Sequence, residues 1–389
     1  MKRDPQLLEA SLADLARQDL RRVRTTIESF AHPDRHVVSV SDGRSLIDFS
    51  SNDYLGLARH PEVAAAMAHA AREWGAGSGA SHLVTGHGIE HARLEEALAE
   101  FTGRERALLF STGYMANLAI VSSLVGRGES VLLDRLSHAS LIDAALLSGA
   151  RFRRYAHADS AAAAKEPATM VATDGVFSMD GDVAPIPDLA RTCRANSSWL
   201  VVDDAHGLGV TGDTGRGSLE HFGAGVDDVP VLMGTLGKAF GCFGAFVAGD
   251  ANLIEHLTQR ARQYIYTTAL PQPVAAAARK ALEVAQRESW RRERVLSLAS
   301  RFRRGMGDDG TRPTTPIQPV VLGSAQAALS AQHKLADAGF RVVAIRPPTV
   351  PRGTARVRVT FSAEHSEDQV DALVDVLSRV RAQHEAVSE

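Results

Sequence analysis

The sequence predicts an α/β protein in which a large domain, built on a mainly parallel central sheet, is followed by a smaller α+β domain. Two observations lead to this fold class. Between residues 106 and 249, short apolar runs alternate with helical segments, and several runs are apolar throughout, as are strands buried on both faces of a parallel sheet. The segment 291–389 instead combines β-rich runs with two helical patterns.

Three features are expected before this alternation begins. Leucines in the first thirty residues recur near helical spacing, which predicts an amphipathic helix. Asp42-Gly43 lies between two β-rich runs and predicts a hairpin. The segments 60–77 and 91–103 are expected to be helices, joined by a polar, glycine-containing loop.

The expected elements of the alternating region follow from the apolar runs and their flanking turn residues. The expected strands are 106–111, 129–135, 151–157, 169–178, 199–206, 229–237 and 244–249, and the expected helices between them include 113–125 and 138–149.

One long helix is expected over 270–306, with a domain boundary inside it near residue 290. The tail is expected to place strands at 316–323, 341–348 and 355–362 around a helix at 324–340, and to end in a helix at 366–385. The resulting division is an N-terminal helix and hairpin segment (1–45), a large domain (46–290) and a small domain (291–389).

Composition excludes several classes of partner. The formal net charge is −3, so neither nucleic acid nor an acidic membrane surface is expected to bind. Cys193 and Cys242 form no C-x-x-C pair, and no apolar run is long enough to span a bilayer. The N-terminal stretch lacks the apolar centre of a signal peptide. We therefore expect a cytoplasmic protein that binds no metal.

Lys238 lies in the stretch GTLGKAFGCFGAF (234–246), among glycines, small residues and phenylalanines. Such surroundings disfavour the ammonium form and lower a lysine pKa, and a desolvated lysine amine can form a Schiff base with a carbonyl. A phosphate-binding P-loop is excluded, because Ala239 follows the Gly-Lys pair and Leu232 stands where its first glycine belongs.

Asp203, Asp204 and His206 follow an apolar strand and precede a G-x-G-x-x-G pattern. A dinucleotide-binding fingerprint would need a helix opening at the third glycine, and the sequence there is a poor helix start. The acidic pair with a histidine could bind a metal, although no further cluster has ligand spacing. Alternatively, an aspartate could pair with a protonated ring nitrogen, as pyridoxal phosphate requires together with a lysine and a phosphate cradle.

A candidate phosphate cradle lies at Ser111-Thr112-Gly113, just before a helix whose first N–H groups favour an anion. An ordinary helix cap with a glycine turn would look the same. Thr235 adds a second hydroxyl near Lys238. His138, at a strand-to-helix turn, is either a structural residue or one that lies flat on a pyridine ring and transfers protons.

Eight motifs occur together in an order that resembles the α-oxoamine synthases, a group of fold-type I pyridoxal-phosphate enzymes. They are FSSNDYLGL, STGYMANLA, DRLSHASL, TDGVFSMDGD, VVDDAHGLGV, GTLGKAFG, IYTTALP and IRPPTVPRGTARVRVT. The resemblance runs from residue 49 to residue 361 and implies an aminotransferase-like fold. The late segment AIRPPTVPRGTARVR, together with FSSNDYLGLARHP, is most similar to the members that serve biotin biosynthesis.

The resemblance implies roles for individual residues around pyridoxal 5'-phosphate. Lys238 would hold the cofactor as a Schiff base, and Asp203 would pair with the pyridine nitrogen. His138 would stack on the ring. His206 and Ser178 would contact the side of the ring hydroxyl, and the catalytic group would be Lys238, His138, Asp203 and His206.

The phosphate would be bound or flanked by backbone groups of Gly113 and Tyr114 and by Thr235, as the resemblance implies. Thr267 or Thr268 would reach it from a second subunit, which implies a homodimer with active sites at the interface.

The implied reaction is a decarboxylative condensation of L-alanine with a pimeloyl thioester, carried by CoA or by an acyl carrier protein. Arg358 would bind the carboxylate of the amino acid, and Asn52, Arg21, His138 and Thr349 would lie on the substrate side. Two alternatives stay open. One is a sister enzyme that uses glycine or serine with another acyl-CoA, and the other is a catalytically silent binding subunit, which the presence of Lys238 argues against.

Overall fold

The structure is a computed structural model that describes residues 5–29, 37–308, 310 and 313–388. Contacts divide these residues into two compact units. The large unit comprises Asn52–Ser178 and Asp182–Arg294, and the small unit comprises the described residues up to Ser51, Met179–Gly181 and those from Val295 onward. The domain boundaries expected from the sequence stay predictions.

The large unit is built on a seven-stranded sheet in the order β4-β10-β9-β8-β7-β5-β6. Its strands are β4 (Arg106–Phe110), β5 (Ser130–Asp134), β6 (Arg151–Tyr155), β7 (Met170–Asp174), β8 (Trp199–Asp203), β9 (Val231–Thr235) and β10 (Ala245–Gly249). Five neighbouring strands, β6 to β9, run parallel, whereas β10 pairs antiparallel with both β4 and β9. The predicted mainly parallel α/β sheet is confirmed.

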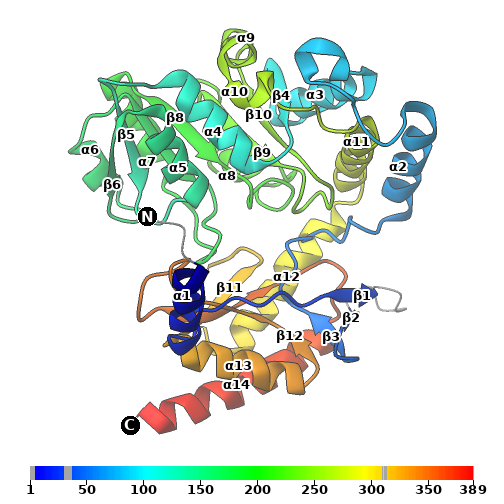
Figure 1. Ribbon diagram of the computed structural model, residues 1–389, viewed down its shortest axis with the longest axis vertical. Coiled ribbons are helices and arrows are strands. Elements are labelled where there is room, and N and C mark those ends of the chain that lie inside the picture. The colour runs from blue at the N-terminus through cyan, green and yellow to red at the C-terminus, as the bar shows by residue number, and fades with distance from the viewer. Residues whose placement is uncertain (1–4, 30–36, 309, 311–312, 389) are drawn as a thin grey trace. The chain divides into compact units, whose positions relative to one another are not determined.

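Helices cover both faces of this sheet (Figure 1), because its strands are apolar on both sides. The helices and helical turns are α2 (Pro61–Trp74), η1 (His82–Gly86), α3 (Ile89–Thr102), α4 (Gly113–Leu124), α5 (Ala139–Ser148), α6 (Ser160–Ala164), α7 (Ile186–Asn196), α8 (Ser218–Phe222), α9 (Ala251–Arg260), α10 (Arg262–Ile265) and α11 (Gln272–Arg287).

Alternate residues of one strand enter different hydrophobic clusters. Val131 and Leu133 of β5 pack with residues of α4 and α5, whereas Leu132 packs with residues of α7. This alternation follows from the two-residue period of a strand. The sheet is therefore the middle layer of a three-layer α/β/α unit.

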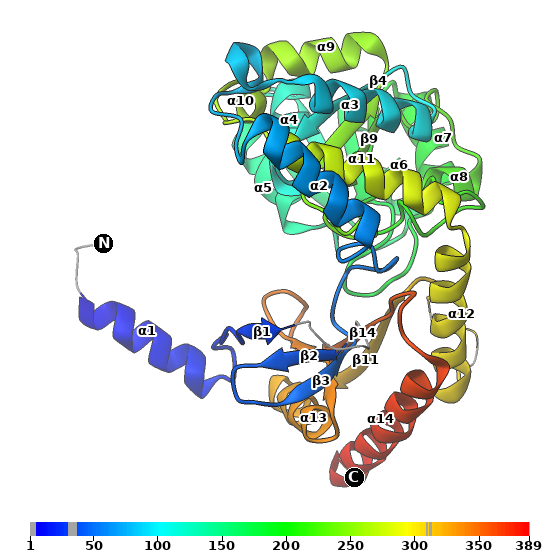
Figure 2. The same cartoon turned by 90° about the vertical axis from the view of Figure 1, so that its right-hand side faces the viewer.

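The small unit contains two sheets. The first joins β1 (Ile27–Ser29), β2 (Val37–Val40), β3 (Ser45–Asp48) and β12 (Phe340–Arg341), and the second joins β11 (Ile317–Gly323), β14 (Ala355–Thr360) and β13 (Val343–Ile345). Its helices, visible in Figure 2, are α1 (Pro5–Arg17), α12 (Trp290–Gly305, whose first residues belong to the large unit), α13 (Ala325–Asp337) and α14 (Glu367–Ser388).

The hairpin predicted at Asp42-Gly43 is confirmed, since β2 and β3 pair antiparallel around Gly43 with its φ of 82°. Its second strand also pairs with β12, parallel, so that segments almost 300 residues apart share one sheet (Phe340 lies opposite Ile47).

The single long helix expected over 270–306 is wrong: α11 ends at Arg287 and α12 begins at Trp290. At Glu288 the backbone leaves the helical region, with φ −106° and ψ 62°. Ser289, of a residue type favoured at helix N-caps, then precedes the new helix. In place of the expected strand 341–348 there are two short strands, β12 and β13, and the expected loop before α3 contains the π-helical turn η1.

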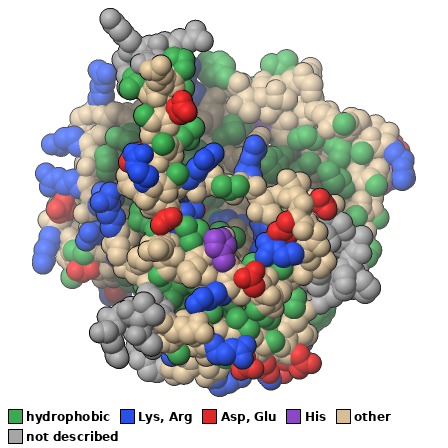
Figure 3. All heavy atoms as spheres, turned by 60° about the horizontal axis from the view of Figure 1, so that its bottom comes forward, with side chains coloured by type: hydrophobic (Ala, Val, Ile, Leu, Met, Phe, Trp, Pro, Cys, Tyr) green, Lys and Arg blue, Asp and Glu red, His purple; other side chains and the backbone are tan. Residues whose placement is uncertain are grey.

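The surface carries charges of both signs, interspersed with exposed hydrophobic side chains, as the face in Figure 3 shows. This agrees with the small net charge of the sequence. Among the described helices, none combines the length and the apolar character that crossing a bilayer requires.

Candidate active site

Polar side chains gather where the parallel strands of the large unit end. Asp174, Asp203 and Thr235 are the last residues of β7, β8 and β9, and Lys238 follows β9 by three residues. Asp174 lies opposite Asp203 in the ladder, so the two carboxylates leave adjacent strands at one edge. The carboxyl edge of an open α/β sheet is where such proteins bind their ligands.

Lys238 is close enough to this edge to affect its neighbours electrostatically. Its positive charge lowers the pKa of His138, Asp174 and Asp204, opposing in both aspartates the larger effect of burial. Burial, with the neighbouring charge of Asp203, raises the pKa of Asp174 well above its ordinary value. The structure thus brings the predicted lysine, aspartate and His138 into one electrostatic group.

Asp203 is buried, with 5% of its surface exposed, and its carboxylate is held from two sides. The side-chain amide of Asn117, on α4, donates to Oδ2 at 2.7 Å, and the N–H of Ala205 donates to Oδ1 at 3.1 Å. These two donors fix the orientation of the carboxylate. A carboxylate held in this way at a strand end is the partner that a protonated ring nitrogen requires.

His138 is the N-cap of α5, where its Nδ1 accepts from the N–H of Ser140 at 3.3 Å. The backbone N–H of His138 donates to Oδ2 of Asp174 at 3.0 Å. Although the residue keeps exposed surface, the dense surroundings of the ring lower its pKa, while Asp203 opposes this effect. His138 is therefore a helix cap in this structure, and its predicted place on a cofactor ring stays a prediction.

Asp204 points into a different environment from Asp203. It is fully buried, accepts from the Ser218 N–H at 2.7 Å and also bonds the Ser218 hydroxyl. Burial raises its pKa to about 7, against the effect of these hydrogen bonds. A Cβ added at Gly217 would lie 1.9 Å from its Oδ2, so glycine is required there. Asp204 thus has a structural role, because its hydrogen bonds join the residue after β8 to the start of α8.

His206 is also buried, and its Nδ1 lies 2.7 Å from the hydroxyl of Tyr54. The same hydroxyl lies 3.3 Å from Oδ1 of Asn52, so two residues predicted for the site share one tyrosine. Tyr54 was missed in the sequence because nothing in the motif FSSNDYLGL separates a core tyrosine from a site tyrosine.

Ser178, the last residue before the small-unit segment Met179–Gly181, also has polar contacts in the structure.

The candidate cradle is a capped helix start, as the sequence predicted. Thr112 is the N-cap of α4, with its Oγ1 accepting from the Met115 N–H at 3.2 Å. The N–H groups of Gly113 and Tyr114, in the first turn, have no acceptor within the helix. The exposed Tyr114 side chain bonds Asp143 on α5. The backbone here is available to an anion, while the tyrosine side chain holds two helices together.

Thr235, Thr267 and Thr268 take different places. Thr235 donates its hydroxyl to the carbonyl of Gly244 at 3.1 Å and accepts from the Gly237 N–H at 3.3 Å, which shapes the turn before Lys238. Thr267 and Thr268 line a small pocket together with Ser111 of the same chain.

Three of the predicted substrate-side residues, Arg21, Thr349 and Arg358, belong to the small unit, whereas Asn52 and His138 belong to the large unit. Arg358 lies on β14 and is buried, with 8% of its surface exposed. Thr349 accepts from Arg22 at 3.2 Å, so the neighbour of the predicted Arg21 makes this contact. The side chain of Arg21 is exposed, and its backbone carbonyl accepts from Arg346 at 3.5 Å.

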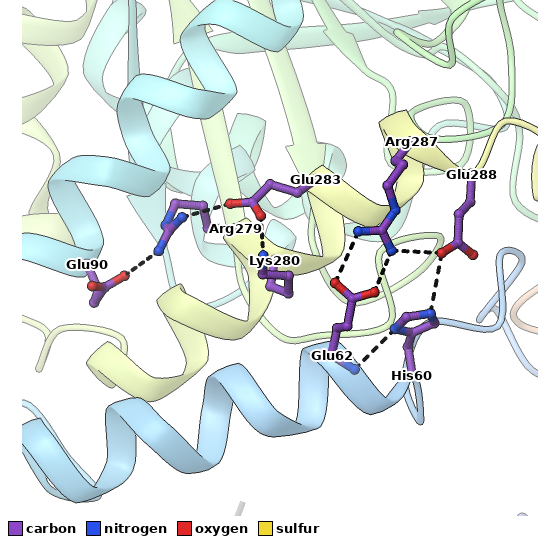
Figure 4. Close-up of polar contacts among 8 residues, drawn as sticks. All are labelled: His60, Glu62, Glu90, Arg279, Lys280, Glu283, Arg287 and Glu288. Carbon is purple, nitrogen blue, oxygen red and sulfur yellow. Dashed lines mark hydrogen bonds and ion pairs between the residues drawn. The ribbon is translucent and has the colours of Figure 1, made fainter.

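Within the part of the chain that the structure describes, one group has metal-ligand spacing: His60, Glu62 and Glu288. Figure 4 shows the guanidinium of Arg287 bonded to both glutamates, at 3.1 Å to Glu62 and 2.9 Å to Glu288. The guanidinium of Arg287 thus supplies the positive charge that a metal ion would bring to these glutamates. We therefore describe His60, Glu62 and Glu288 as part of the ion pairs that join α2 to the end of α11.

The residues of the large unit fit pyridoxal phosphate by the chemistry of their donor set. A lysine amine, a buried carboxylate with oriented donors, and a helix start with two N–H groups converge on one sheet edge. Asn117 was missed in the sequence because it lies within an otherwise apolar helix, where its burial could not be foreseen.

Comparison with known proteins gives the same classification. The family model described as aminotransferase class I and II matches residues 44–377. The chain is 56% identical over 382 residues to 8-amino-7-oxononanoate synthase of Thioalkalivibrio sulfidiphilus, covering 96% of each chain, and 56% identical to that of Methylococcus capsulatus, covering 95% and 97%.

Solved structures with the same fold include serine palmitoyltransferase of Sphingomonas wittichii, with TM-score 0.90, 31% identity and coverage of 98% of each chain. The 8-amino-7-oxononanoate synthase of Francisella tularensis has TM-score 0.77 and 31% identity, covering 87% of this chain and 99% of that one. The chain belongs to the class I and II aminotransferase family and, within it, to the 8-amino-7-oxononanoate synthases.

Proposed function

We propose that the protein is a pyridoxal-phosphate-dependent acyltransferase that condenses L-alanine with a pimeloyl thioester. The products are 8-amino-7-oxononanoate, carbon dioxide and free thiol, a step of biotin biosynthesis. The observation that carries this proposal is the buried Asp203 carboxylate, oriented by Asn117 at the same sheet edge as Lys238. Relatives of this chain at 54–56% identity, among them proteins of Thioalkalivibrio sulfidiphilus and Pseudomonas putida, bear the name of this synthase.

Pyridoxal phosphate supplies an aldehyde that an amine can join and a ring that accepts electrons. Lys238 would hold it through the aldehyde, Asp203 would pair with the ring nitrogen, and His138 would stack on the ring, with His206 and Ser178 on the side of the ring hydroxyl. The N–H groups at the start of α4 would bind the phosphate, together with Thr235 and with Thr267 or Thr268.

The side chains divide the remaining work. The amine of Lys238, released from the aldehyde when the amine of alanine takes its place, would take the proton from the α-carbon of alanine. Arg358 binds the carboxylate of alanine through its planar guanidinium. His138 donates to the carbonyl oxygen of the thioester. Asn52, Arg21 and Thr349 contact the substrates.

Two finer features belong to the same proposal. We expect a homodimer in which Thr267 or Thr268 serves the phosphate of the partner's site, and a thioester donor that is either CoA or an acyl carrier protein. Both cysteines are free thiols, which suits a reducing cytoplasm.

The deciding experiment is an assay of purified protein, reconstituted with pyridoxal phosphate, against alanine, glycine and serine with pimeloyl-CoA, pimeloyl carrier protein and palmitoyl-CoA. Mass spectrometry should detect 8-amino-7-oxononanoate only with alanine and a pimeloyl donor. A product formed mainly from serine or glycine would instead identify a sister synthase.

Lys238→Ala is the matching variant. It should lose the condensation and the borohydride-trapped lysine adduct together. Normal condensation by Lys238→Ala would refute the assignment of the lysine. A wild-type protein that takes up no cofactor would point to a binding subunit.

A further inference from the structure

Four polar side chains of the large unit form a continuous hydrogen-bonded chain from the end of β8 to the start of α5. Asn117 Nδ2 donates to Asp203 Oδ2 at 2.7 Å and to Ser140 Oγ at 2.8 Å. Ser140 Oγ in turn lies 2.7 Å from Nδ1 of His138. Asn117 and Ser140 are fully buried, with 0% of their surface exposed, so water does not compete for these bonds.

The direction of each bond in this chain is decided by chemistry. The amide of Asn117 must present its nitrogen to Asp203, because its oxygen would face a carboxylate oxygen. Its second N–H then reaches Ser140 Oγ. A hydroxyl that accepts there still has its own proton to donate, and the acceptor within reach is Nδ1 of His138.

A second donor converges on the same ring nitrogen. The backbone N–H of Ser140 lies 3.3 Å from His138 Nδ1. An N–H can only donate, so Nδ1 must offer a lone pair, and the single proton of the neutral ring is left on Nε2. A proton on Nδ1 would point at this N–H, so that two donors would face each other. The Ser140 hydroxyl would then lie between two donors, Asn117 Nδ2 and His138 Nδ1, and would have no acceptor for its own proton.

We propose that Asn117 and Ser140 are positioning residues that hold His138 as the neutral Nε2–H tautomer and link this tautomer to the orientation of the Asp203 carboxylate. His138 then offers a donor, and not an acceptor, from Nε2. The lowered pKa of His138 agrees with a neutral ring. The catalytic consequence, donation to a carbonyl oxygen, rests on the proposed function, whereas the tautomer itself does not.

The tautomer can be observed in the full chain labelled with ¹⁵N-histidine, without added cofactor, since the shifts of protonated and unprotonated ring nitrogens are well separated. The chain has 15 histidines, and His138 is assigned as the signal pair missing from His138→Gln. We expect an unprotonated Nδ1 and a protonated Nε2 in the wild type at neutral pH. A proton on Nδ1 in the wild type would overturn the proposal without any further variant.

Ser140→Ala tests the link. It should move the His138 signals towards the average of the two tautomers and raise the ring pKa, because the neutral form loses a donor. Asn117→Ala should shift them in the same direction, since Ser140 is no longer held by its second partner. Ser148→Ala is the matched control on the same helix, because its hydroxyl bonds the Ala145 carbonyl outside the chain of bonds. Unchanged His138 signals in Ser140→Ala would refute the link.

Kinetics separate this inference from the proposed function. In the reconstituted enzyme, Ser140→Ala should lower kcat about tenfold while KM for alanine stays unchanged, as the loss of one neutral hydrogen bond predicts. A wild type without condensation activity would refute the proposed function and leave the tautomer result standing. Equal kcat values for Ser140→Ala and the wild type would refute the catalytic consequence alone.

Discussion

His157 and Asp182 are joined by a 2.7 Å hydrogen bond between Nε2 and Oδ2, and the opposite ring nitrogen of His157 bonds Asp134 at 2.9 Å. Burial lowers the histidine pKa, but the two hydrogen bonds and the two negative charges together raise it to about 10. His157 is therefore an imidazolium that joins Asp134, the last residue of β5, to Asp182, the residue that follows Met179–Gly181.

This cation predicts a specific pH dependence of stability. A folded pKa of about 10 against an ordinary value of 6.5 means that the contribution of His157 is fully present below pH 6.5 and is lost as pH rises through 10. His157→Gln should lower the free energy of unfolding at pH 6 and have a shrinking effect towards pH 10. Urea unfolding at several pH values measures this, and parallel profiles for the two proteins would contradict it.

Gly217 is predicted to be irreplaceable because of Asp204. It has φ 89° and ψ −164°, and an added Cβ would lie 1.9 Å from the buried carboxylate. Gly75 is a matched control, with φ 77° and ψ −175° but no atom within 4 Å of its Cβ position.

Gly75→Ala should therefore cost only the backbone strain, about 1–3 kcal/mol. Gly217→Ala should cost at least about 2 kcal/mol more, from overpacking in the core. Thermal or urea unfolding gives both values, and equal losses would show that the crowding around Asp204 relaxes freely.

Asp203→Asn is predicted to abolish most activity without unfolding the protein. Asparagine keeps the size of the side chain and can still accept from Asn117, but it lacks the charge that stabilises a protonated ring nitrogen. We expect kcat to fall by about 100-fold or more, as when a preorganised electrostatic partner is removed.

The control for this prediction is Asp188→Asn, which changes a half-exposed carboxylate paired with Arg191 on α7. Its kcat should equal that of the wild type. If Asp203→Asn retained wild-type kcat, the pairing of this carboxylate with the ring would be refuted.

Arg358 is predicted to bind the carboxylate of alanine. Losing a charged hydrogen bond of about 1.5–3 kcal/mol should raise KM for alanine roughly 10- to 100-fold in Arg358→Ala. Arg358→Lys should recover part of the loss, because lysine keeps the charge without the bidentate geometry.

Arg44→Ala provides the comparison, since Arg44 is an exposed residue paired with Asp42 in the β2–β3 turn. It should leave KM unaltered. A KM for alanine that does not respond to Arg358→Ala would remove this arginine from the substrate side.

Several elements could be predicted because their signals are local. The continuously apolar runs predicted the strands β5 and β8, and Asp42-Gly43 predicted the β2–β3 hairpin. The break between α11 and α12 could not be predicted, because both halves favour helix and the interruption covers only Glu288 and Ser289. The antiparallel direction of β10 could not be predicted either, because the residues of the strand are apolar like those of the parallel strands of the sheet.

The candidate site divides in the same way. Lys238, Asp203 and His138 could be proposed from residue type, neighbouring glycines and motif order, because these are local features of the sequence. Their partners could not, since Asn117 is 86 positions from Asp203 and Tyr54 is 152 positions from His206. Contacts at such separations exist only after the strands have paired and the helices have packed. Local patterns were therefore enough to propose the reactive side chains, whereas tertiary packing determined which hydrogen-bond partners orient them.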